Sequence, residues 1–477
     1  MTLRIADMAR LNGVALHGCE SLMDTPIARV LTDSRELRAG DVFVAFAGAR
    51  VDGHAMVGAA IAAGAVACVV RNAWWRKHRS DVASLPLVVV PDTMRAFGEI
   101  ARLHRNHFDI PVLGITGSNG KTGTKEMLAA VLRTKYRVLA TEGNFNNHIG
   151  LPATLLRLDD SAQVVVLEMG TNQPGDIAWL CDIARPTHGV ITNIGRAHIE
   201  KLLSREGIAE EKSALYRALP SGGVAIVNAD EPLLRGRVPR RARRIGYGYA
   251  AKADVRITQV TLDAQARPTV RFEAPAFVAR PFTLTLHAIG RHAAMNAAAA
   301  LATGFAFGCS LRAMKQAIER VESYDKRMQV VEAGGITMLN DTYNANPDSV
   351  LAGLGVLCDM RSEGERCAVL GDMLELGSAA RAEHERIGEA VVDAGIPMLL
   401  TLGRASRALH RAARARAEER GQRLVAQHFT DVDQLVAALD ALLALGDVVL
   451  VKGSRGMRME RIVDELRLRR GSMEARV

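Results

Sequence analysis

The sequence predicts a three-domain α/β protein whose sheets are largely parallel. Short apolar runs alternate with helix-compatible stretches along almost the whole chain, as expected for strand–helix–strand units. The chain of 477 residues is also longer than a single domain with one hydrophobic core usually is, since a domain typically contains about 150 residues. Hydrophobic residues make up 48% and charged residues 24% of the chain, which excludes a mostly disordered protein.

The predicted domains comprise residues 1–110, 111–325 and 326–477. The first has short, irregular elements and is expected to be a small mixed α/β N-terminal domain. The last contains CAVLGDM, PMLLTLG and DVVLVKGS, each followed by a helix-compatible stretch, and is predicted to be a Rossmann-like doubly wound C-terminal domain. In the central domain, predicted to be of the P-loop ATP-binding type, we expect strands at 112–116, 163–169, 189–193, 223–228, 254–262 and 268–273, the last two antiparallel.

The most specific motif is a phosphate loop, GITGSNGKT at 114–122, between the first central strand and a predicted helix. Glycines without a Cβ let backbone N–H groups approach phosphate oxygens, and the N-terminus of the helix adds its dipole. The standard pattern GxxxxGK[ST] requires glycine where this chain has Ile115, so only the TGxxGKT half is intact. We predict that ATP phosphates bind at Gly117, Ser118, Asn119, Gly120, Lys121, Thr122 and Gly123.

A carboxylate suited to holding Mg²⁺ stands at the end of another apolar strand. Glu168 follows the apolar run 164–167, and an acid at the carboxyl end of a buried parallel strand faces the crevice where ligands bind. The Thr122 hydroxyl is expected to share the metal. His198 lies in the loop after a further strand, although a lone histidine is more often structural than a ligand.

The chain resembles the Mur ligase family, and the resemblance runs over essentially its whole length. The motifs that carry it are TGSNGKT (116–122), VLEMG (166–170), TNIGRAHIE (192–200), EEKSALY (210–216) and GRHAAMNAAAA (290–300). The resemblance implies an ATP-dependent ligase that activates a carboxylate as an acyl phosphate and then joins it to an amine. It also implies that the domains close around ATP, with a hinge near 325–327.

The resemblance implies specific roles for residues of the central and last domains. The implied catalytic group consists of Lys121, Glu168, His198, Lys212 and Arg327. Two Mg²⁺ ions would be held by Thr122, Glu168, His198 and Lys212, the lysine as an N-carbamoylated side chain. ATP would also contact Asn296 at the adenine, Arg327 at the γ-phosphate and Asp341 at the ribose. Alternatively, Lys212 is an ordinary lysine on a helix surface.

Further segments resemble the branch of the family that adds D-alanyl-D-alanine to a UDP-N-acetylmuramoyl-tripeptide. These segments are TDSR (32–35), EGNFNNHIGLP (142–152), NDTYNANPDS (340–349), VLGDMLELG (369–377) and VLVKGSRGM (449–457). By this resemblance the UDP part of the substrate would meet Asp33, Ser34, Arg35, Asn144, Asn146 and Asn147. Asp372 and Lys452 stand at predicted strand ends, and we hypothesise that they face the D-Ala-D-Ala site.

Other enzymatic interpretations stay open. The nearest are a diamino-acid-adding ligase and a folylpolyglutamate synthetase of the same superfamily, although TDSR and the NFNN segment favour a UDP-muramoyl substrate. The sequence does not decide whether the tripeptide ends in diaminopimelate or lysine. A dinucleotide site is suggested by GYGYAA at 246–251, but this segment leads into a predicted strand rather than the required helix.

The net charge is +9, with 51 Arg against only 10 Lys. Arg-rich segments at 235–244 and 404–423 raise the possibility of a nucleic-acid-dependent ATPase. Aromatic residues make up only 4%, however, which leaves few platforms for base stacking, and no helix-turn-helix or zinc-finger pattern occurs in the sequence. We therefore expect no nucleic-acid partner, and we attribute the positive charge partly to polyanionic substrates, ATP and a UDP-sugar.

The sequence predicts a cytoplasmic protein. It contains no export signal and no apolar run of the roughly 20 residues needed to span a membrane. Its six cysteines form no CxxC motif and no paired spacing, which favours reduced thiols. A monomer is the expected oligomeric state.

Overall fold

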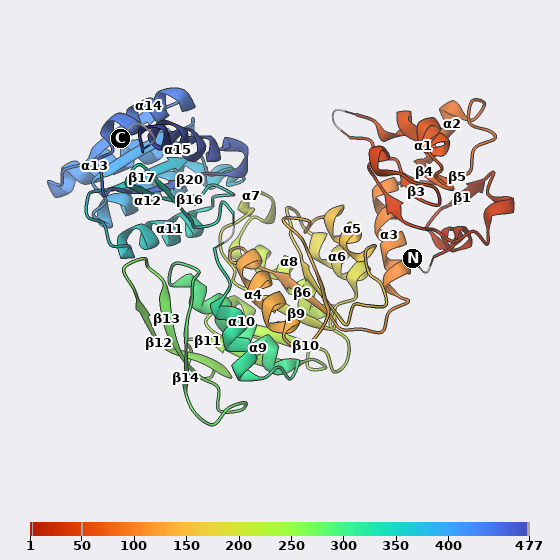
Figure 1. Ribbon diagram of the computed structural model, residues 1–477, viewed down its shortest axis with the longest axis horizontal. Coiled ribbons are helices and arrows are strands. Elements are labelled where there is room, and N and C mark those ends of the chain that lie inside the picture. Colours follow the sequence, from red (N-terminus) through yellow and green to blue (C-terminus); the bar gives the residue numbers. More distant parts are fainter. Residues whose placement is uncertain (2, 49–50, 324, 475–477) are drawn as a thin grey trace.

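The computed structural model describes residues 1, 3–48, 51–323 and 325–474, and it contains three β-sheets, each with its own helices. Figure 1 shows them following one another along the chain, from the N-terminal domain in red and orange to the C-terminal domain in blue. The first and last domains stand apart in this view, and both adjoin the middle domain. The predicted three-domain α/β architecture is confirmed.

The N-terminal domain is built on a five-stranded sheet in the order β1-β5-β4-β3-β2, in which only β1 is antiparallel to its neighbour. Its strands are short, as the sequence indicated. The elements are η1 (Ile5–Arg10), β1 (Ala15–His17), η2 (Glu20–Leu22), β2 (Val30–Leu31), η3 (Ser34–Glu36), β3 (Val42–Val44), η4 (Gly53–Met56), α1 (Val57–Ala62), β4 (Ala67–Arg71), α2 (Asn72–His78), β5 (Leu87–Val90) and α3 (Thr93–Arg105).

The middle domain is built on a nine-stranded sheet in the order β14-β13-β12-β11-β10-β9-β6-β8-β7. Its strands are β6 (Val112–Thr116), β7 (Val138–Ala140), β8 (Val164–Glu168), β9 (His188–Ile191), β10 (Val224–Asn228), β11 (Arg243–Gly248), β12 (Val255–Leu262), β13 (Pro268–Glu273) and β14 (Phe282–Thr285). Its helices are α4 (Lys121–Arg133), α5 (Gly150–Leu155), α6 (Asp176–Ala184), α7 (Ile199–Leu202), α8 (Arg205–Arg217), η5 (Pro232–Leu234), α9 (His292–Ala306) and α10 (Leu311–Glu319).

The predicted change of strand direction in this sheet is confirmed, because β12, β13 and β14 pair antiparallel whereas β7 to β12 pair parallel. Three strands were not expected from the sequence. β7 is short and only half-buried, β11 begins with two exposed arginines, and β14 exposes alternate residues, so none has a continuous apolar run. The GYGYAA segment begins inside β11 and is followed by β12, so the helix that a dinucleotide site requires is absent there.

The middle sheet is covered on both faces, which explains its continuous apolar strands. In β8, Val164 and Val166 contribute to one hydrophobic core, and Val165 and Leu167 contribute to another on the opposite face. The first core also contains residues of α4 and α9, and the second contains residues of α6 and α8. Parallel strands buried on both faces lose the polar alternation of half-exposed strands.

The C-terminal domain has a six-stranded sheet in the order β15-β16-β20-β17-β18-β19, in which only β15 is antiparallel. Alternate residues of β17 contribute to two different cores, so helices cover both faces, as predicted for a doubly wound domain. Its elements are β15 (Gln329–Ala333), β16 (Ile336–Asp341), α11 (Pro347–Asp359), β17 (Arg366–Gly371), η6 (Gly377–Ala379), α12 (Ala380–Asp393), β18 (Met398–Leu402), α13 (Ser406–Arg420), β19 (Val425–Phe429), α14 (Val432–Leu442), β20 (Val448–Lys452), η7 (Arg455–Met457) and α15 (Glu460–Glu474).

In the described part of the chain, no helix combines the length and the apolar character that a membrane span requires.

Tyr216 links α8 to the middle sheet. Its buried hydroxyl donates a hydrogen bond to the Ile226 carbonyl of β10 (2.8 Å) and accepts one from the Ile191 amide of β9 (3.3 Å). Tyr216→Phe should therefore leave buried polar groups unpaired and lower the free energy of unfolding by about 1–2 kcal/mol. We expect a lower urea midpoint for the middle domain and faster hydrogen exchange at the Ile191 amide.

The control is Tyr249→Phe, since Tyr249 is 45% exposed and loses no comparable buried hydrogen bond. Equal urea midpoints for the two variants would contradict the assigned role of Tyr216.

Candidate active site

The phosphate loop connects β6 to α4. At one position, Gly117, only glycine tolerates the backbone conformation of this loop. Gly117 has φ +151°, and a Cβ placed there would lie 1.8 Å from Oγ1 of Thr192, in the loop after β9. Gly120 has φ +77° and immediately precedes α4. The Lys121 ammonium folds back over the loop and donates to the Gly117 carbonyl (2.9 Å). The loop therefore has the backbone geometry that a phosphate-binding turn needs.

Two predicted metal ligands, Thr122 and Glu168, are in contact. The Thr122 hydroxyl donates to Oε2 of Glu168 (2.9 Å), and the Asn146 amide donates to its Oε1 (2.7 Å). Glu168 is buried at the end of β8, as expected from its position in the sequence. A hydroxyl and a carboxylate oxygen beside a phosphate loop suit Mg²⁺, which keeps waters and phosphate oxygens as its remaining ligands. The described residues include no group of three or more Asp, Glu, His or Cys side chains that could hold a metal ion by themselves.

Lys212 is buried on α8, so the interpretation of it as a surface lysine is wrong. Burial lowers the pKa of its ammonium well below the usual value, nearby Lys121 adds to the shift, and Glu211 opposes it. Glu211 is itself occupied, since it accepts hydrogen bonds from the amides of Gly175 and Ile177. Burial also lowers the pKa of Lys121; Glu168 opposes this change and Arg327 adds to it.

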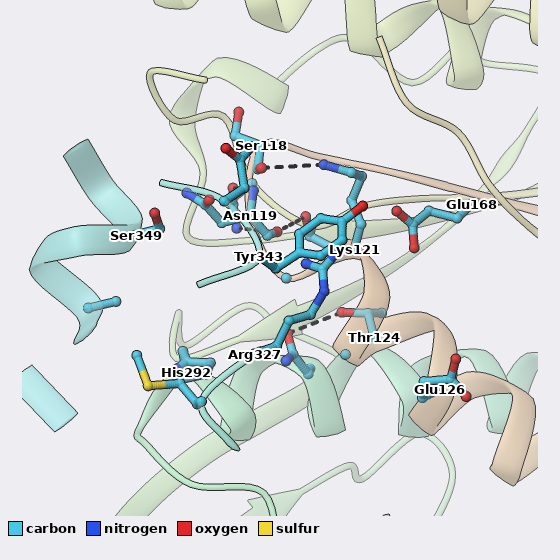
Figure 2. Close-up of a pocket in the computed structure, with 18 of the residues that line it drawn as sticks. Ser118, Asn119, Lys121, Thr124, Glu126, Glu168, His292, Arg327, Tyr343 and Ser349 are labelled. Carbon is cyan, nitrogen blue, oxygen red and sulfur yellow. Dashed lines mark hydrogen bonds between the residues drawn. The ribbon is translucent and has the colours of Figure 1, made fainter. Parts of the chain in front are cut away.

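The phosphate loop opens into a cavity of about 580 Å³ whose walls come from the middle and C-terminal domains (Figure 2). The structure brings most of the predicted site residues to this cavity. Those that line it are Ser118, Asn119, Gly120, Lys121, Gly123, Asn146, Asn147, Glu168, His198, Asn296, Arg327, Asp341 and Lys452. Among the lining residues that were not predicted is Tyr343, whose ring centroid lies 3.8 Å from the Arg327 guanidinium carbon, so that the ring supports this cation at the cavity.

Polar contacts fix several of these side chains. Asn296 on α9 accepts a hydrogen bond from the Thr124 hydroxyl (3.1 Å), and it lies so close to Gly120 that a Cβ there would meet its Oδ1 at 2.9 Å. On the opposite wall, Asp341 at the end of β16 pairs with Lys452 at the end of β20 (2.5 Å). Lys452 also donates to the Asn344 carbonyl (2.8 Å). These contacts orient donors and acceptors around the cavity before any ligand binds.

His198 stands where the middle domain meets the C-terminal domain. It lines the cavity, and its Nδ1 is 2.5 Å from Oε2 of Glu375, in the segment after β17. His198 has φ +59° and Glu375 has φ +62°, both in the left-handed region that is unfavourable for side chains of this kind. No local pattern indicated this pairing, because His198 and Glu375 are far apart along the chain.

Four predicted substrate residues lie outside the cavity. Asp33, Ser34 and Arg35 lie in the N-terminal domain, where Asp33 caps η3 and binds the Arg35 side chain, which lowers the Asp33 pKa to about 2. Asn144 lies on the loop before α5 and is also not among the lining residues.

Asp372 is not brought to the cavity either. Its buried carboxylate accepts hydrogen bonds from the amides of Arg404 (3.0 Å) and Ser406 (2.7 Å). The sequence-based expectation that it faces a substrate does not fit this position, because both of its oxygens are engaged by backbone within the C-terminal domain.

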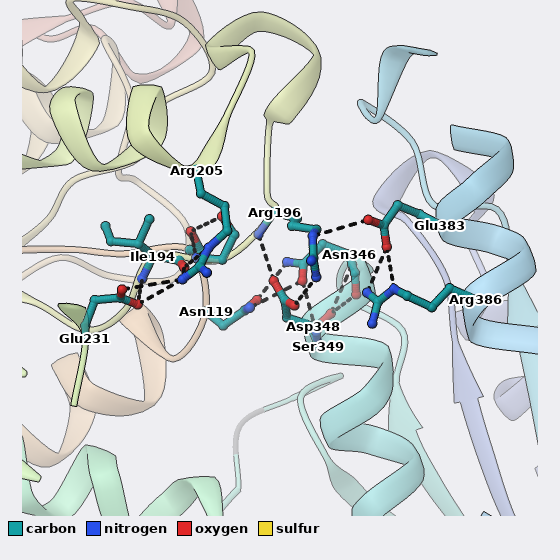
Figure 3. Close-up of polar contacts among 12 residues, drawn as sticks. Asn119, Ile194, Arg196, Arg205, Glu231, Asn346, Asp348, Ser349, Glu383 and Arg386 are labelled. Atoms are coloured by element: carbon teal, nitrogen blue, oxygen red, sulfur yellow. Dashed lines mark hydrogen bonds and ion pairs between the residues drawn. The ribbon is translucent and has the colours of Figure 1, made fainter. Parts of the chain in front are cut away.

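The phosphate loop is also joined directly to the C-terminal domain (Figure 3). The side-chain amides of Asn119 and Asn346 exchange two hydrogen bonds, of 2.7 and 3.3 Å. Beside them, Arg196 donates its backbone amide to Asp348 (2.7 Å) and its guanidinium lies 3.2 Å from Glu383. These contacts hold α11 and α12 against the loops that form the floor of the cavity.

A phosphate loop that faces a doubly wound domain across a shared cavity defines a nucleotide-binding enzyme whose site is completed by two domains. Family models match all three parts of the chain. They are "Mur ligase family, catalytic domain" at residues 26–105, "Mur ligase middle domain" at 115–304 and "Mur ligase, glutamate ligase domain" at 326–455. The chain belongs to the Mur ligase family.

Relatives narrow the comparison to one branch of the family. The chain is 35% identical over 443 residues to the UDP-N-acetylmuramoyl-tripeptide–D-alanyl-D-alanine ligase of Bacillus subtilis, covering 93% of each chain. It is 36% identical over 462 residues to the Escherichia coli ligase of the same name, covering 96% of each.

Solved structures of MurF ligases have the same fold as this chain. A MurF structure from Acinetobacter baumannii superimposes with a TM-score of 0.82 at 30% identity, covering 92% of this chain and 93% of that one. The MurF ligase of Thermotoga maritima in complex with ADP superimposes with a TM-score of 0.81, also at 30% identity, covering 95% and 99%.

The Arg196 contacts should help to hold the two domains closed. Arg196→Gln removes the guanidinium from Asp348 and Glu383, and since these groups are partly exposed, the loss should be about 1 kcal/mol, or roughly fivefold in the closing equilibrium. We expect a larger radius of gyration by small-angle X-ray scattering and a higher KM for ATP.

The matched control is Arg205→Gln, because Arg205 binds Glu231 within the middle domain and crosses no domain boundary. An effect of Arg205→Gln equal to that of Arg196→Gln would show that domain closure is not involved.

Proposed function

We propose that this chain joins D-alanyl-D-alanine to a UDP-N-acetylmuramoyl-tripeptide with hydrolysis of ATP, producing the pentapeptide precursor of peptidoglycan. The observation that carries this proposal is the 35–36% identity, over more than nine-tenths of each chain, to ligases that bear this name. The cavity supports it, because a phosphate loop, an acidic metal-binding position and cations from a second domain converge there.

ATP would lie with its phosphates on the loop between β6 and α4. Lys121 and Arg327 reach the same cavity from the two domains and would bind the terminal phosphates. Asn296 and Asp341 would contact the adenine and the ribose, respectively. The solved relative from Thermotoga maritima contains ADP, which supports a nucleotide in this position.

The main obstacle to the reaction is electrostatic, because two anions, the tripeptide carboxylate and the γ-phosphate of ATP, must approach each other. The tripeptide carboxylate attacks the γ-phosphorus of ATP, ADP leaves, and the resulting acyl phosphate is attacked by the dipeptide amine, releasing phosphate. Coulomb repulsion between carboxylate and phosphate opposes the first step, and Lys121 and Arg327 offset it. Mg²⁺ bound by Thr122 and Glu168 would neutralise further phosphate charge. Domain closure would exclude water, which otherwise hydrolyses the acyl phosphate.

The buried amine of Lys212, which is not among the residues that line the cavity, has the chemistry needed to become a carbamate. A neutral amine attacks CO₂ and releases a proton, and the lowered pKa of the buried Lys212 favours the neutral amine. The product is an anion that would complement the cations of the site and provide oxygen ligands for a second Mg²⁺, together with His198. The proximity of Lys121 would then become stabilising rather than repulsive.

With ¹³C-labelled bicarbonate, the protein should show a carbamate carbonyl resonance that disappears in Lys212→Arg and persists in Lys252→Arg, a control at an exposed lysine. Lys212→Arg should also reduce ligation at least a hundredfold, since arginine cannot form the carbamate. Near-normal turnover of Lys212→Arg would contradict the carbamate.

The UDP portion would extend from the cavity toward the N-terminal domain, with Asp33, Ser34 and Arg35 on that side and Asn144, Asn146 and Asn147 on the middle domain. A nucleotide-linked substrate fits a cytoplasmic enzyme, although location and a monomeric state stay predictions of the sequence.

The reaction is tested by phosphate release with UDP-N-acetylmuramoyl-tripeptides ending in diaminopimelate or lysine, each with and without D-Ala-D-Ala. Release should require ATP, Mg²⁺, a tripeptide and the dipeptide together. Release driven instead by a free diamino acid or by glutamate would favour the diamino-acid-adding ligase or the folylpolyglutamate synthetase. Stimulation by DNA, lost at high salt, would support a nucleic-acid-dependent ATPase.

A further inference from the structure

The short helix α7 belongs to the middle domain but is held by the C-terminal domain, beside which it lies in Figure 1. Ile199, its first residue, packs against hydrophobic cores of both domains. The Glu200 amide donates a hydrogen bond to the Glu375 carbonyl (3.2 Å). A Cβ at Gly377 would lie 3.4 Å from Cα of Glu200, so the two backbones approach closely. The position of α7 therefore depends on the segment 375–377 of the other domain.

His198 stands immediately before α7 and adds a side-chain contact to this connection. Its Nδ1 is 2.5 Å from Oε2 of Glu375, and both residues have left-handed backbone, with φ +59° and +62°. Backbone strain of this kind persists only where the surroundings fix it, and it concentrates at functional sites. The strain therefore points to a role of this pair in the site.

Glu375 lies on a loop that the C-terminal domain holds in place. The Leu374 amide donates a hydrogen bond to the Ser454 hydroxyl (2.8 Å), and the Met373 amide donates one to Nε2 of the buried His384 (3.0 Å). Both of these contacts lie within the C-terminal domain. Because its neighbours along the chain are fixed in this way, the carboxylate of Glu375 moves with the C-terminal domain rather than with α7.

The contact determines which nitrogen of the His198 ring carries the proton. A carboxylate is ionised at neutral pH and can then only accept hydrogen bonds, so Nδ1 of His198 is the donor. In a neutral imidazole with its proton on Nδ1, Nε2 is the nitrogen that can bind a metal ion. His198 also lines the nucleotide cavity. A histidine that binds a metal commonly donates its other N–H to a carboxylate, which fixes the orientation of the ring.

We propose that Glu375 is a positioning residue for His198. Its carboxylate, carried by the C-terminal domain, fixes the ring with Nδ1 protonated and thereby leaves Nε2 available to the metal ion that accompanies ATP. The inference rests on the proposed function, because it presupposes that Mg²⁺ and a nucleotide bind in this cavity. When the domains separate, His198 loses its fixed orientation and the site loses affinity for the metal. Metal binding is thereby coupled to the contact between the two domains.

A purely structural role, in which Glu375 only helps to hold the domains together, makes a different prediction. Glu383 provides the matched control for that role. It also lies in the C-terminal domain, and it pairs across the same boundary with Arg196 (3.2 Å), as Figure 3 shows. Its other ion pair is with Arg386, on its own helix. Glu383→Ala therefore weakens the boundary without removing the partner of His198.

The test measures Mn²⁺ binding by electron paramagnetic resonance in the presence of ADP, without peptide substrates. Glu375→Ala should weaken Mn²⁺ binding by about tenfold or more, the usual effect of removing a carboxylate that orients a metal-binding histidine. Glu375→Gln should restore part of the affinity, because its side-chain carbonyl can still accept a hydrogen bond from Nδ1. In a His198→Ala background, Glu375→Ala should have no further effect, whereas Glu383→Ala should have the same effect in both backgrounds.

A second readout needs no metal and no variant. In the metal-free wild-type protein, ¹⁵N NMR of the histidine side chains at alkaline pH should place the proton of neutral His198 on Nδ1. A proton on Nε2 would overturn the proposal.

The proposal is also overturned if Glu375→Ala leaves the Mn²⁺ affinity unchanged, or weakens it equally when His198 is absent. A wild-type protein that binds no Mn²⁺ with ADP would have the same consequence. None of these measurements uses D-Ala-D-Ala, so failure of the proposed function, seen as the absence of dipeptide-dependent phosphate release, is a distinct result.

Discussion

The close approach of Gly117 to Thr192 is the contact on which the rest of the site depends. Because Gly117 lacks a Cβ, the Thr192 hydroxyl can reach past it and donate to the Asn119 carbonyl (2.6 Å). Asn193 then accepts a hydrogen bond from the Asn119 amide (3.0 Å). The phosphate loop is thereby fixed to the loop after β9, and the Asn119 side chain is left to bind Asn346 of the C-terminal domain. The absence of a Cβ at Gly117 thus allows the phosphate loop to be linked, through Asn119, to the C-terminal domain.

Several of the few lysines of the chain lie at buried positions or at the cavity. Only 10 lysines occur against 51 arginines, yet Lys125, Lys212 and Lys452 are buried and Lys121 lines the cavity. Two of them have a geometric reason in their contacts: Lys125 donates to the Thr141 carbonyl behind the loop, and Lys452 fits between Asp341 and Asn344. A compact ammonium fits such places, whereas a planar guanidinium does not. The Arg-rich segments lie elsewhere, as on α13, where Arg416 pairs with Asp393 and Glu419 on the surface.

The two domains meet through polar contacts at the site and through an apolar contact, in which Ala266 and Ile289 of the middle domain join a hydrophobic core of the C-terminal domain. Paired amides and partly exposed ion pairs such as Asn119–Asn346 and Arg196–Asp348 can exchange with water, which suits a boundary that would open to admit substrates. Bound ATP, which would touch both walls, would supply the remaining attraction. One closing motion would then bring the nucleotide and the tripeptide carboxylate together.

The sequence by itself determined what depends on neighbours along the chain: the alternation of strands and helices, the phosphate loop, and Glu168 at the end of an apolar strand. It missed β7, β11 and β14, because pairing with a neighbouring strand rather than a local pattern stabilises them. It placed Asp372 at a strand end but could not say that backbone amides of Arg404 and Ser406 would occupy the carboxylate.

Tertiary structure alone decided that Lys212 is buried beside Lys121, that Tyr343 supports Arg327, and that His198 meets Glu375. In each case the partners come from different elements, and in the last two at least one comes from the C-terminal domain. The physical reason is that burial and charge pairing depend on distance in space, which a sequence records only where the chain folds back locally.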